Sequence, residues 1–315
     1  MTAVAFIGLG IMGAPMARNL LASGFAVTGF NRSAGAVTRF AADGGRAAAN
    51  VADAVRDADV VATMLPDSPD VDTVLRGADG VFARARPGAL LIDFSTIRPD
   101  VAVRLADEAA GRGFPLLDAP VSGGEQAAID GTLSVMAGGT AAAFAAAGPV
   151  LAAVGTTIAH VGSSGAGQTV KAANQLIVAG TIELVAEAIV FLEAHGVDPE
   201  VAVGALAGGL AGNAVLQRKA PAMLARDFRP GFRIDLHHKD MGIVTEAARR
   251  TGVALPLGAA AAGLIASARA QGLGGLDHSV LLRTVELLSG RAPGTSEGAT
   301  LPGAGGASSS RLRSR

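Results

Sequence analysis

Val4-Ala5-Phe6-Ile7-Gly8-Leu9-Gly10-Ile11-Met12-Gly13-Ala14-Pro15 is the stretch that decides the fold. An apolar run typical of a strand ends at three glycines spaced Gly-x-Gly-x-x-Gly, and a helical segment follows at residues 14–23. In such a unit the first glycine permits a tight turn, the second lets the backbone approach a pyrophosphate, and the third lets helix and strand pack closely. The helix N-terminus also offers N–H groups to phosphates. The stretch predicts a dinucleotide site formed by Gly8, Leu9, Gly10, Ile11, Met12 and Gly13; the alternative is an ordinary glycine-rich turn.

The alternation of strand and helix continues through the first half of the chain. Apolar runs at residues 26–30, 60–65, 89–94 and 116–118 are typical of strands, and helix-like segments separate them. Strands that alternate with helices form parallel sheets with helices on both faces, because the crossovers are right-handed. We therefore predict an α/β fold of the Rossmann type, with a doubly wound, mostly parallel sheet.

The pattern changes after His160. A glycine- and serine-rich segment at 162–167 is expected to act as a hinge, and most of the chain beyond it has helical periodicity. One long helix is expected at 168–195, with further helices that begin after Asp198, at Asn213, at Asp235 and at Leu255. The predicted domains are an NAD(P)-binding Rossmann domain at 1–162, an all-helical substrate and oligomerisation domain at 163–290, and a disordered tail at 291–315.

Composition excludes several classes of function. The chain has 315 residues, a net charge of −1 and no cysteine, which excludes disulfides, thiolate catalysis and cysteine-based metal sites. No basic run points to nucleic acid, and the N-terminus leads directly into the glycine motif without the pattern of a signal peptide, so we expect a cytoplasmic protein. The apolar stretch at 169–194 contains four charged residues, which favour a buried helix over a membrane span: Lys171, Glu183, Glu187 and Glu193.

The end of the second strand bears on the choice of cofactor. NAD-specific sites usually carry an acidic residue about 20 residues beyond the glycine motif, to bind the ribose hydroxyls. Here the chain has Asn31, Arg32 and Ser33, and an arginine with small polar neighbours suits the 2′-phosphate of NADP. We predict NADP as the favoured cofactor, with NAD as the alternative. Further cofactor contacts are predicted at Met64, Leu65 and Pro66.

Lys171 and Asn174 form the candidate catalytic pair. Their i, i+3 spacing places both on one face of the long helix. A partly buried lysine has a lowered pKa and becomes a usable proton donor near neutral pH. The adjacent residues His237 and His238 point about 100° apart on a helix and do not converge on one ion, so we interpret them as structural and predict no metal site.

Four motifs in this order resemble the β-hydroxyacid dehydrogenase family over residues 1 to about 290. They are the glycine motif above, the stretch Asp118-Ala119-Pro120-Val121-Ser122-Gly123-Gly124, the stretch Gly167-Gln168-Thr169-Val170-Lys171-Ala172-Ala173-Asn174-Gln175, and the stretch Phe232-Arg233-Ile234-Asp235-Leu236-His237-His238-Lys239-Asp240.

The resemblance implies roles for individual residues. Lys171 would be the general acid in reduction, and Asn174 would hold a substrate oxygen and orient Lys171. Ser122, Gly123 and Gly124 would form a loop that binds the substrate carboxylate. Thr96 would lie by the nicotinamide ribose, and Lys239 would close on cofactor and substrate with Asp240 beside it.

Within the family, several stretches resemble the subgroup that reduces tartronate semialdehyde (2-hydroxy-3-oxopropionate) to glycerate. They are residues 208–212, 219–221, 228–233, 272–274 and 277–279. The alternative is a 3-hydroxyisobutyrate dehydrogenase or another short-chain relative, and a more distant alternative is a dinucleotide-binding protein without catalysis. We expect a small hydroxy acid or semialdehyde as substrate, no nucleic acid or membrane partner, and a homodimer or homotetramer.

Overall fold

A computed structural model describes residues 1–291, and the predicted tail lies outside the described residues except for Arg291. The first part of the chain forms one sheet with the strand order β3-β2-β1-β4-β5-β6-β8-β7, and β9 pairs with β8. Its strands are β1 (Ala3–Ile7), β2 (Ala26–Phe30), β3 (Arg46–Ala47), β4 (Val60–Thr63), β5 (Leu90–Asp93), β6 (Leu116–Asp118), β7 (Val121–Ser122), β8 (Leu133–Gly138) and β9 (Gly155–Gly162). The strands from β3 to β6 are parallel.

The strand order confirms the doubly wound fold that the sequence predicts. The chain places β2 and β3 on one side of β1 and then crosses to β4 and β5 on the other side. Ligands in such sheets bind beyond the carboxyl ends of the strands, where the winding direction changes. The glycine motif follows β1, so it lies at this switch point.

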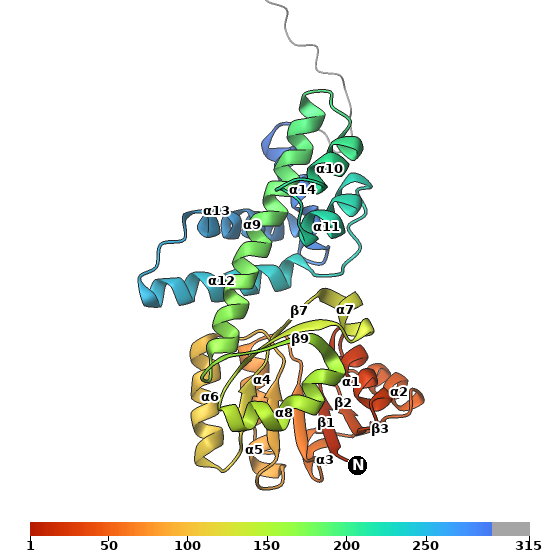
Figure 1. Cartoon of the computed structure of the whole chain (residues 1–315), viewed down its shortest axis with the longest axis vertical. Helices are drawn as coiled ribbons and strands as arrows, with labels where there is room; N and C mark the ends of the chain where they lie inside the picture. Colours follow the sequence, from red (N-terminus) through yellow and green to blue (C-terminus); the bar gives the residue numbers. More distant parts are fainter. Residues whose placement is uncertain (292–315) are drawn as a thin grey trace, which may run out of the picture. The chain divides into compact units, whose positions relative to one another are not determined.

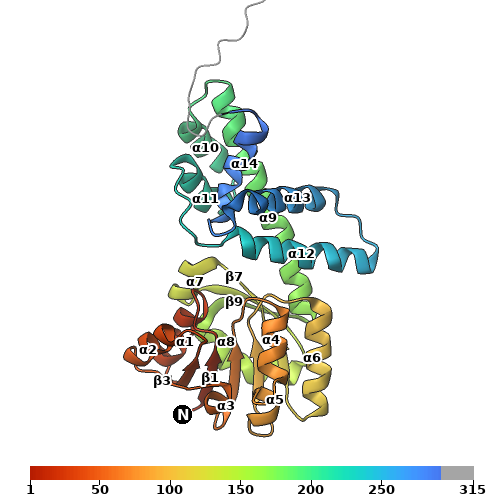
Figure 2. The same ribbon diagram turned by 180° about the vertical axis from the view of Figure 1, so that it is seen from behind.

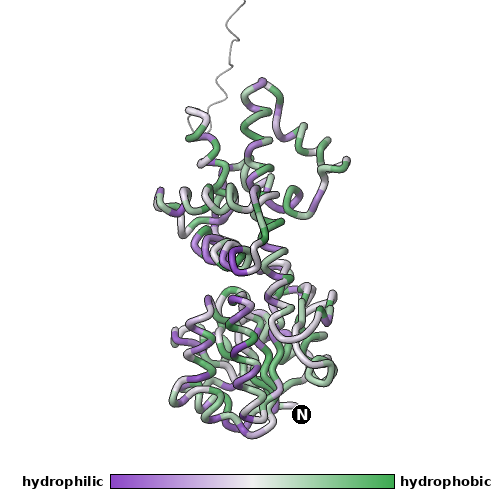
Figure 3. The backbone as a smooth tube through the Cα atoms, turned by 90° about the vertical axis from the view of Figure 1, so that its left-hand side faces the viewer, coloured by the Kyte–Doolittle hydropathy of each residue, from purple (hydrophilic) through white to green (hydrophobic). Residues whose placement is uncertain are grey.

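Helices cover both faces of the sheet and bury two separate apolar clusters. Figure 1 shows α8 (Ala141–Val154) across one face, where α1 (Gly13–Ala22), α2 (Ala34–Ala42) and α7 (Gly124–Asp130) complete one cluster around Phe6 and Phe94. Figure 2 shows the opposite face, where α3 (Val51–Val55), α4 (Ser68–Arg76), α5 (Val81–Arg84) and α6 (Pro99–Gly111) bury Ile7 and Leu91. The strands between them are mostly hydrophobic (Figure 3).

After β9 the described chain is helical, as predicted. The helices are α9 (Ala166–Ala194), α10 (Pro199–Ala207), α11 (Ala214–Leu224), α12 (Ile234–Thr251), α13 (Pro256–Ala268) and α14 (Leu281–Leu288), with short irregular helices at Arg269–Leu273 and His278–Val280. By length and composition α9 could span a membrane. Its buried residues include Lys171, Gln175 and Glu183, and we interpret it as a core helix.

The chain packs into two compact units. One comprises Met1–Gly180 with Arg229–His278, and the other comprises Thr181–Phe228 with the chain from Ser279. These two units are defined by how the chain packs. The predicted domain boundary at residue 162 instead marks where the secondary structure changes from alternating strands and helices to helices alone. The first unit contains the sheet, the start of α9, and α12 with α13, so every predicted site residue belongs to it.

Candidate active site

The glycine loop after β1 is shaped for close approach of a ligand. Gly8 has a φ of 104°, and a Cβ atom there would lie 2.2 Å from the Met64 carbonyl oxygen. A Cβ atom on Gly13 would lie 1.9 Å from the Gly8 carbonyl oxygen, whereas one on Gly10 would meet no atom within 4 Å. Only glycine fits at Gly8 and Gly13, and the space above Gly10 is open at the start of α1. This loop fits the pyrophosphate of a dinucleotide.

The end of β2 supports the loop. Asn31 accepts a hydrogen bond from the Leu9 N–H through Oδ1, at 3.1 Å. Arg32 is 83% exposed, and its Nη1 lies 3.7 Å from Asp70 Oδ1, a long surface ion pair. Ser33 occupies the N-cap position of α2 without a side-chain cap. Asn31 therefore fixes the loop, and the Arg32 guanidinium remains available at the edge of the site.

Buried polar groups fix the turn after β4, where cofactor contacts are predicted at residues 64–66. Leu65 N–H donates to Ser95 Oγ at 2.8 Å. Asp93 accepts hydrogen bonds from Thr63 Oγ1 at 2.7 Å and from Ser95 N–H at 3.1 Å. Burial raises the pKa of Asp93 to about 6. This network joins the ends of two neighbouring strands, and no local sequence pattern indicates it.

Lys171 lies buried in the second turn of α9. Its ammonium group donates to Gln175 Oε1 at 3.1 Å, and Asn174 Nδ2 donates to the same oxygen at 2.8 Å. Burial is the main cause that lowers the pKa of Lys171 to about 8; the nearby Asp240 carboxylate opposes the shift and the Lys239 ammonium adds to it. A lysine with this pKa is mostly protonated at neutral pH and can still release its proton.

Other predicted residues join this pair from three segments of the chain. Ser122 Oγ, at the end of β7, donates to Asn174 Oδ1 at 3.3 Å. Lys239 on α12 donates to the Thr96 carbonyl oxygen at 2.6 Å and pairs with Asp240 Oδ1 at 2.8 Å. The structure therefore brings together the predicted set Lys171, Asn174, Ser122, Thr96 and Lys239.

The loop after Ser122 has the backbone that its glycines permit. Gly123 and Gly124 have φ angles of 138° and 72°. A Cβ atom on Gly123 would lie 2.5 Å from the Ala127 side chain, whereas one on Gly124 would meet no atom within 4 Å. Residues with a Cβ are strained at both positions, so the sequence Gly-Gly is required to turn the chain beside Ser122.

Asp118 and Gln168, to which the sequence assigned no role, fix the start of α9. Asp118 accepts hydrogen bonds from Gly165 N–H at 2.7 Å and from Gln168 N–H at 3.0 Å. The Gln168 side chain accepts from Ile97 N–H at 3.0 Å and donates to the Ser95 carbonyl oxygen at 2.8 Å, so it binds the backbone on both sides of Thr96. The segment expected as a hinge is thus tied to β6 and to the loop after β5.

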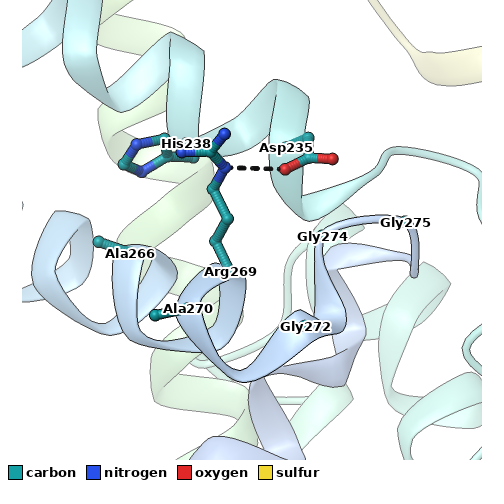
Figure 4. A pocket seen from close by; sticks show the side chains of 8 residues that line it. All are labelled: Asp235, His238, Ala266, Arg269, Ala270, Gly272, Gly274 and Gly275. Atoms are coloured by element: carbon teal, nitrogen blue, oxygen red, sulfur yellow. Dashed lines mark hydrogen bonds and ion pairs between the residues drawn. The ribbon is translucent and has the colours of Figure 1, made fainter.

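The two histidines on α12 have different surroundings. His237 is buried, lies with Nδ1 3.2 Å from His278 Nδ1, and burial lowers its pKa to about 4. His238 lines an open depression in which Arg269 bonds Asp235 at 2.9 Å (Figure 4). No predicted site residue lines this depression. Within the described residues, no group of three or more acidic residues or histidines is arranged to hold a metal ion.

Two family models together match most of the chain. Residues 3–162 match the NAD binding domain of 6-phosphogluconate dehydrogenase, and residues 165–285 match the family described as NAD-binding of NADP-dependent 3-hydroxyisobutyrate dehydrogenase.

Individual relatives align over most of their length. The chain is 40% identical over 286 residues to the 2-hydroxy-3-oxopropionate reductase of Escherichia coli K12, covering 90% of this chain and 97% of that protein. It is also 40% identical over 291 residues to the 3-sulfolactaldehyde reductase of the same strain, covering 92% and 98%. A solved structure of Mycobacterium tuberculosis 3-hydroxyisobutyrate dehydrogenase with L-serine superposes with a TM-score of 0.83 at 36% identity, covering 90% and 99%.

Proposed function

Since this chain belongs to the β-hydroxyacid dehydrogenase family, whose members are NAD(P)-dependent enzymes acting on CH–OH groups, we propose that it reduces tartronate semialdehyde to glycerate. The subgroup stretches and the similarity to a 2-hydroxy-3-oxopropionate reductase support this substrate. Equal identity to a 3-sulfolactaldehyde reductase makes another three-carbon aldehyde acid the second candidate. The similarity to a 3-hydroxyisobutyrate dehydrogenase favours a third substrate, with a methyl group.

The observation that carries the proposal is the buried Lys171 ammonium group next to Asn174. When bound, the reduced nicotinamide supplies hydride to the carbonyl carbon of the substrate. Lys171 donates a proton to the carbonyl oxygen as that oxygen gains negative charge, and in oxidation the neutral amine accepts the hydroxyl proton. Ser122 and Asn174 provide polar groups for the substrate oxygens.

The assay that tests the substrate measures NADPH consumption with three aldehyde acids at matched concentrations. We expect the highest kcat/KM with tartronate semialdehyde, compared with 3-sulfolactaldehyde and the semialdehyde of 3-hydroxyisobutyrate. Pocket contacts that distinguish such small substrates contribute about 1–3 kcal/mol, or roughly 10- to 200-fold. A higher kcat/KM with either of the other two aldehydes would change the substrate assignment but not the reaction type.

The Lys171→Ala variant tests the role of the lysine. We expect kcat to fall by about 10²–10⁴-fold, because general acid catalysis contributes that much, while the Kd of NADPH changes little. An Arg84→Ala variant, which removes an exposed cation on α5, is the control and should keep its turnover. If Lys171→Ala retains wild-type turnover, the general acid role is wrong.

We further propose NADP over NAD, because Asn31 and Arg32 stand where NAD-specific sites carry a carboxylate. The exposed Arg32 guanidinium would pair with the 2′-phosphate. Arg32→Ala is expected to raise the KM for NADPH about 10-fold, equivalent to about 1.4 kcal/mol, and to leave the KM for NADH unchanged. Arg18→Ala, which removes another exposed arginine, is the control. An equal effect on both cofactors would contradict this assignment.

A further inference from the structure

The Gln175 side chain lies at the centre of the active-site network. Its Oε1 accepts from Lys171 and from Asn174, and its Nε2 donates to Asp240 Oδ2 at 2.5 Å. Asp240 in turn pairs with Lys239, which bonds the Thr96 carbonyl. A single amide therefore connects the lysine on α9 to the lysine on α12.

The charges on either side fix the orientation of this amide. An ammonium group only donates hydrogen bonds, and an ionised carboxylate only accepts them. The amide oxygen must face Lys171 and the amide nitrogen must face Asp240. The opposite orientation would set NH₂ against NH₃⁺ and oxygen against carboxylate. Gln175 is also buried, so water cannot readily replace either partner.

We propose that Gln175 is a positioning residue for the reaction, whose neutral amide holds the Lys171 ammonium group in place and keeps it from pairing directly with the Asp240 carboxylate. The inference rests on the proposed role of Lys171 as general acid. An amide acceptor directs the ammonium group without adding a negative charge to it. A direct ion pair would stabilise the charged lysine and oppose release of its proton.

The surrounding charges explain why a neutral spacer matters. The groups that influence Lys171 through their charge are Asp240, which favours the ammonium form, and Lys239, which opposes it. Lys239 also neutralises Asp240 at 2.8 Å. His237, on the same helix, has its pKa lowered to about 4 by burial and is uncharged at neutral pH. A carboxylate at position 175 would upset this balance, because it would contact the ammonium group directly.

The first experiment replaces the amide by a carboxylate of the same shape. In Gln175→Glu, competitive acetylation with acetic anhydride, measured at Lys171 by mass spectrometry, reports the ionisation of the lysine without any turnover. We expect the midpoint to rise by about one pH unit or more relative to the wild type, because an opposite charge within about 4–6 Å shifts a pKa by that much. The pH above which kcat/KM for reduction falls should rise with it. Gln217→Glu, an exposed position on α11, adds the same charge elsewhere and should leave both midpoints unchanged.

A second variant removes the hydrogen bonds without adding charge. In Gln175→Met the lysine loses its acceptor, so we expect kcat to fall about 10- to 100-fold, since small errors in the placement of a reacting group have effects of this size. The acetylation midpoint should stay at or below that of the wild type, and the KM for NADPH should not change. Thermal unfolding of each variant shows whether it is folded. If Gln175→Glu does not fold, the kcat of Gln175→Met tests the role of Gln175.

The outcomes separate the inference from the proposed function. An unmoved Lys171 midpoint in folded Gln175→Glu, or wild-type kcat in Gln175→Met, would overturn the role of Gln175. A purely structural role predicts equal losses in both variants with no change in pH dependence. Full activity in Lys171→Ala would instead refute the general acid, whatever the acetylation midpoints show.

Discussion

Lys171 and Glu183 are both buried on α9, but only the lysine has a hydrogen-bond partner that offsets the cost of burying its charge. Lys171 has Gln175 as a partner, whereas neither oxygen of Glu183 has a hydrogen-bond partner among residues 1–291. Burial first, and then the charge of Glu187, raise the pKa of Glu183 to about 7. Glu183 therefore costs stability whenever it is ionised in the folded protein.

This surrounding makes stability depend on pH in a defined direction. The unfolded chain ionises Glu183 near its ordinary pKa of about 4.5, whereas the folded protein keeps the proton until about pH 7. The free energy of unfolding therefore falls as the pH rises from about 4.5 to about 7. Above pH 7 this loss of stability has reached its full size. Glu183→Gln should remove it and raise stability at pH 8 by about 2–3 kcal/mol. Unfolding in urea at pH 5 and pH 8 measures this difference, with Glu200→Gln, at an exposed position on α10, as control. Equal gains at both pH values would show that Glu183 is not the cause.

At the residue scale, the sequence predicted the members of the site better than their connections. The spacing of Lys171 and Asn174 on one helix face is a local property. Motifs pointed to Ser122 and Lys239, and the family resemblance implied Thr96. Gln175 stands four residues after Lys171, a spacing that also predicts contact on a helix. Its importance comes from Asp240, which is 65 residues away in the sequence. No local pattern predicts that contact.

At the scale of elements, the attachment of α9 to the sheet decides where Lys171 stands. Asp118 at the end of β6 accepts two N–H groups from the start of α9, groups that a helix leaves without internal partners. A Cβ atom on Gly167 would lie 2.6 Å from the Asp118 carbonyl oxygen, so glycine is needed for this close approach. The glycines of the 162–167 segment thus permit packing of the helix start against the sheet.

Asp118→Ala tests this attachment. Two buried N–H groups would lose their acceptor, at about 1–3 kcal/mol each, so we expect a loss of stability on the order of 2–6 kcal/mol. We also expect a lower kcat, because Lys171 lies one turn further along α9. Denaturant unfolding and steady-state kinetics measure the two effects. Asp43→Asn, which weakens an exposed ion pair with Arg18, should change stability by less than about 1 kcal/mol. Wild-type stability in Asp118→Ala would show that the cap is dispensable.

Most of the strands that the sequence did not predict have weak local signals. The strands from β1 to β6 that carry apolar runs lie within two residues of their predicted positions. In contrast, β7 has two residues and β9 has a single buried residue, so neither shows a clear apolar pattern. The pairing of β8 with β6 is antiparallel and joins distant residues. These strands are formed by tertiary pairing, which overrides local preference.

At the scale of the whole molecule, the site depends on segments that are far apart in the sequence. Within the first compact unit, the loop after β5, the end of β7, the start of α9 and the start of α12 each contribute a residue. The doubly wound sheet brings the ends of β1, β4 and β5 to one edge, and this follows from the alternation of strands and helices. The placement of α12 against this edge cannot be predicted from the sequence pattern and is seen only in the structure.

The second compact unit exposes several large apolar side chains. On α9, Leu184 and Phe191 are 62% and 63% exposed, and their seven-residue spacing places them on the same side of the helix. Val201 on α10 is 71% exposed. Surfaces of this kind mark contacts with other chains. We therefore propose that the protein forms a homodimer or homotetramer through this unit.

Phe191→Glu should dissociate that assembly, because burying a carboxylate in an apolar contact costs several kcal/mol. Light scattering at working concentration should give a multiple of 31.1 kDa for the wild type and a lower mass for the variant. Val103→Glu, at an exposed position on α6 of the first unit, adds the same charge and should keep the wild-type mass. A wild-type protein that is monodisperse at the monomer mass would overturn the proposal, and an unchanged mass in Phe191→Glu would move the contact to another face. Since all the site residues belong to the first unit, the dissociated variant should keep measurable turnover, and complete loss of activity would indicate that a second copy completes the site.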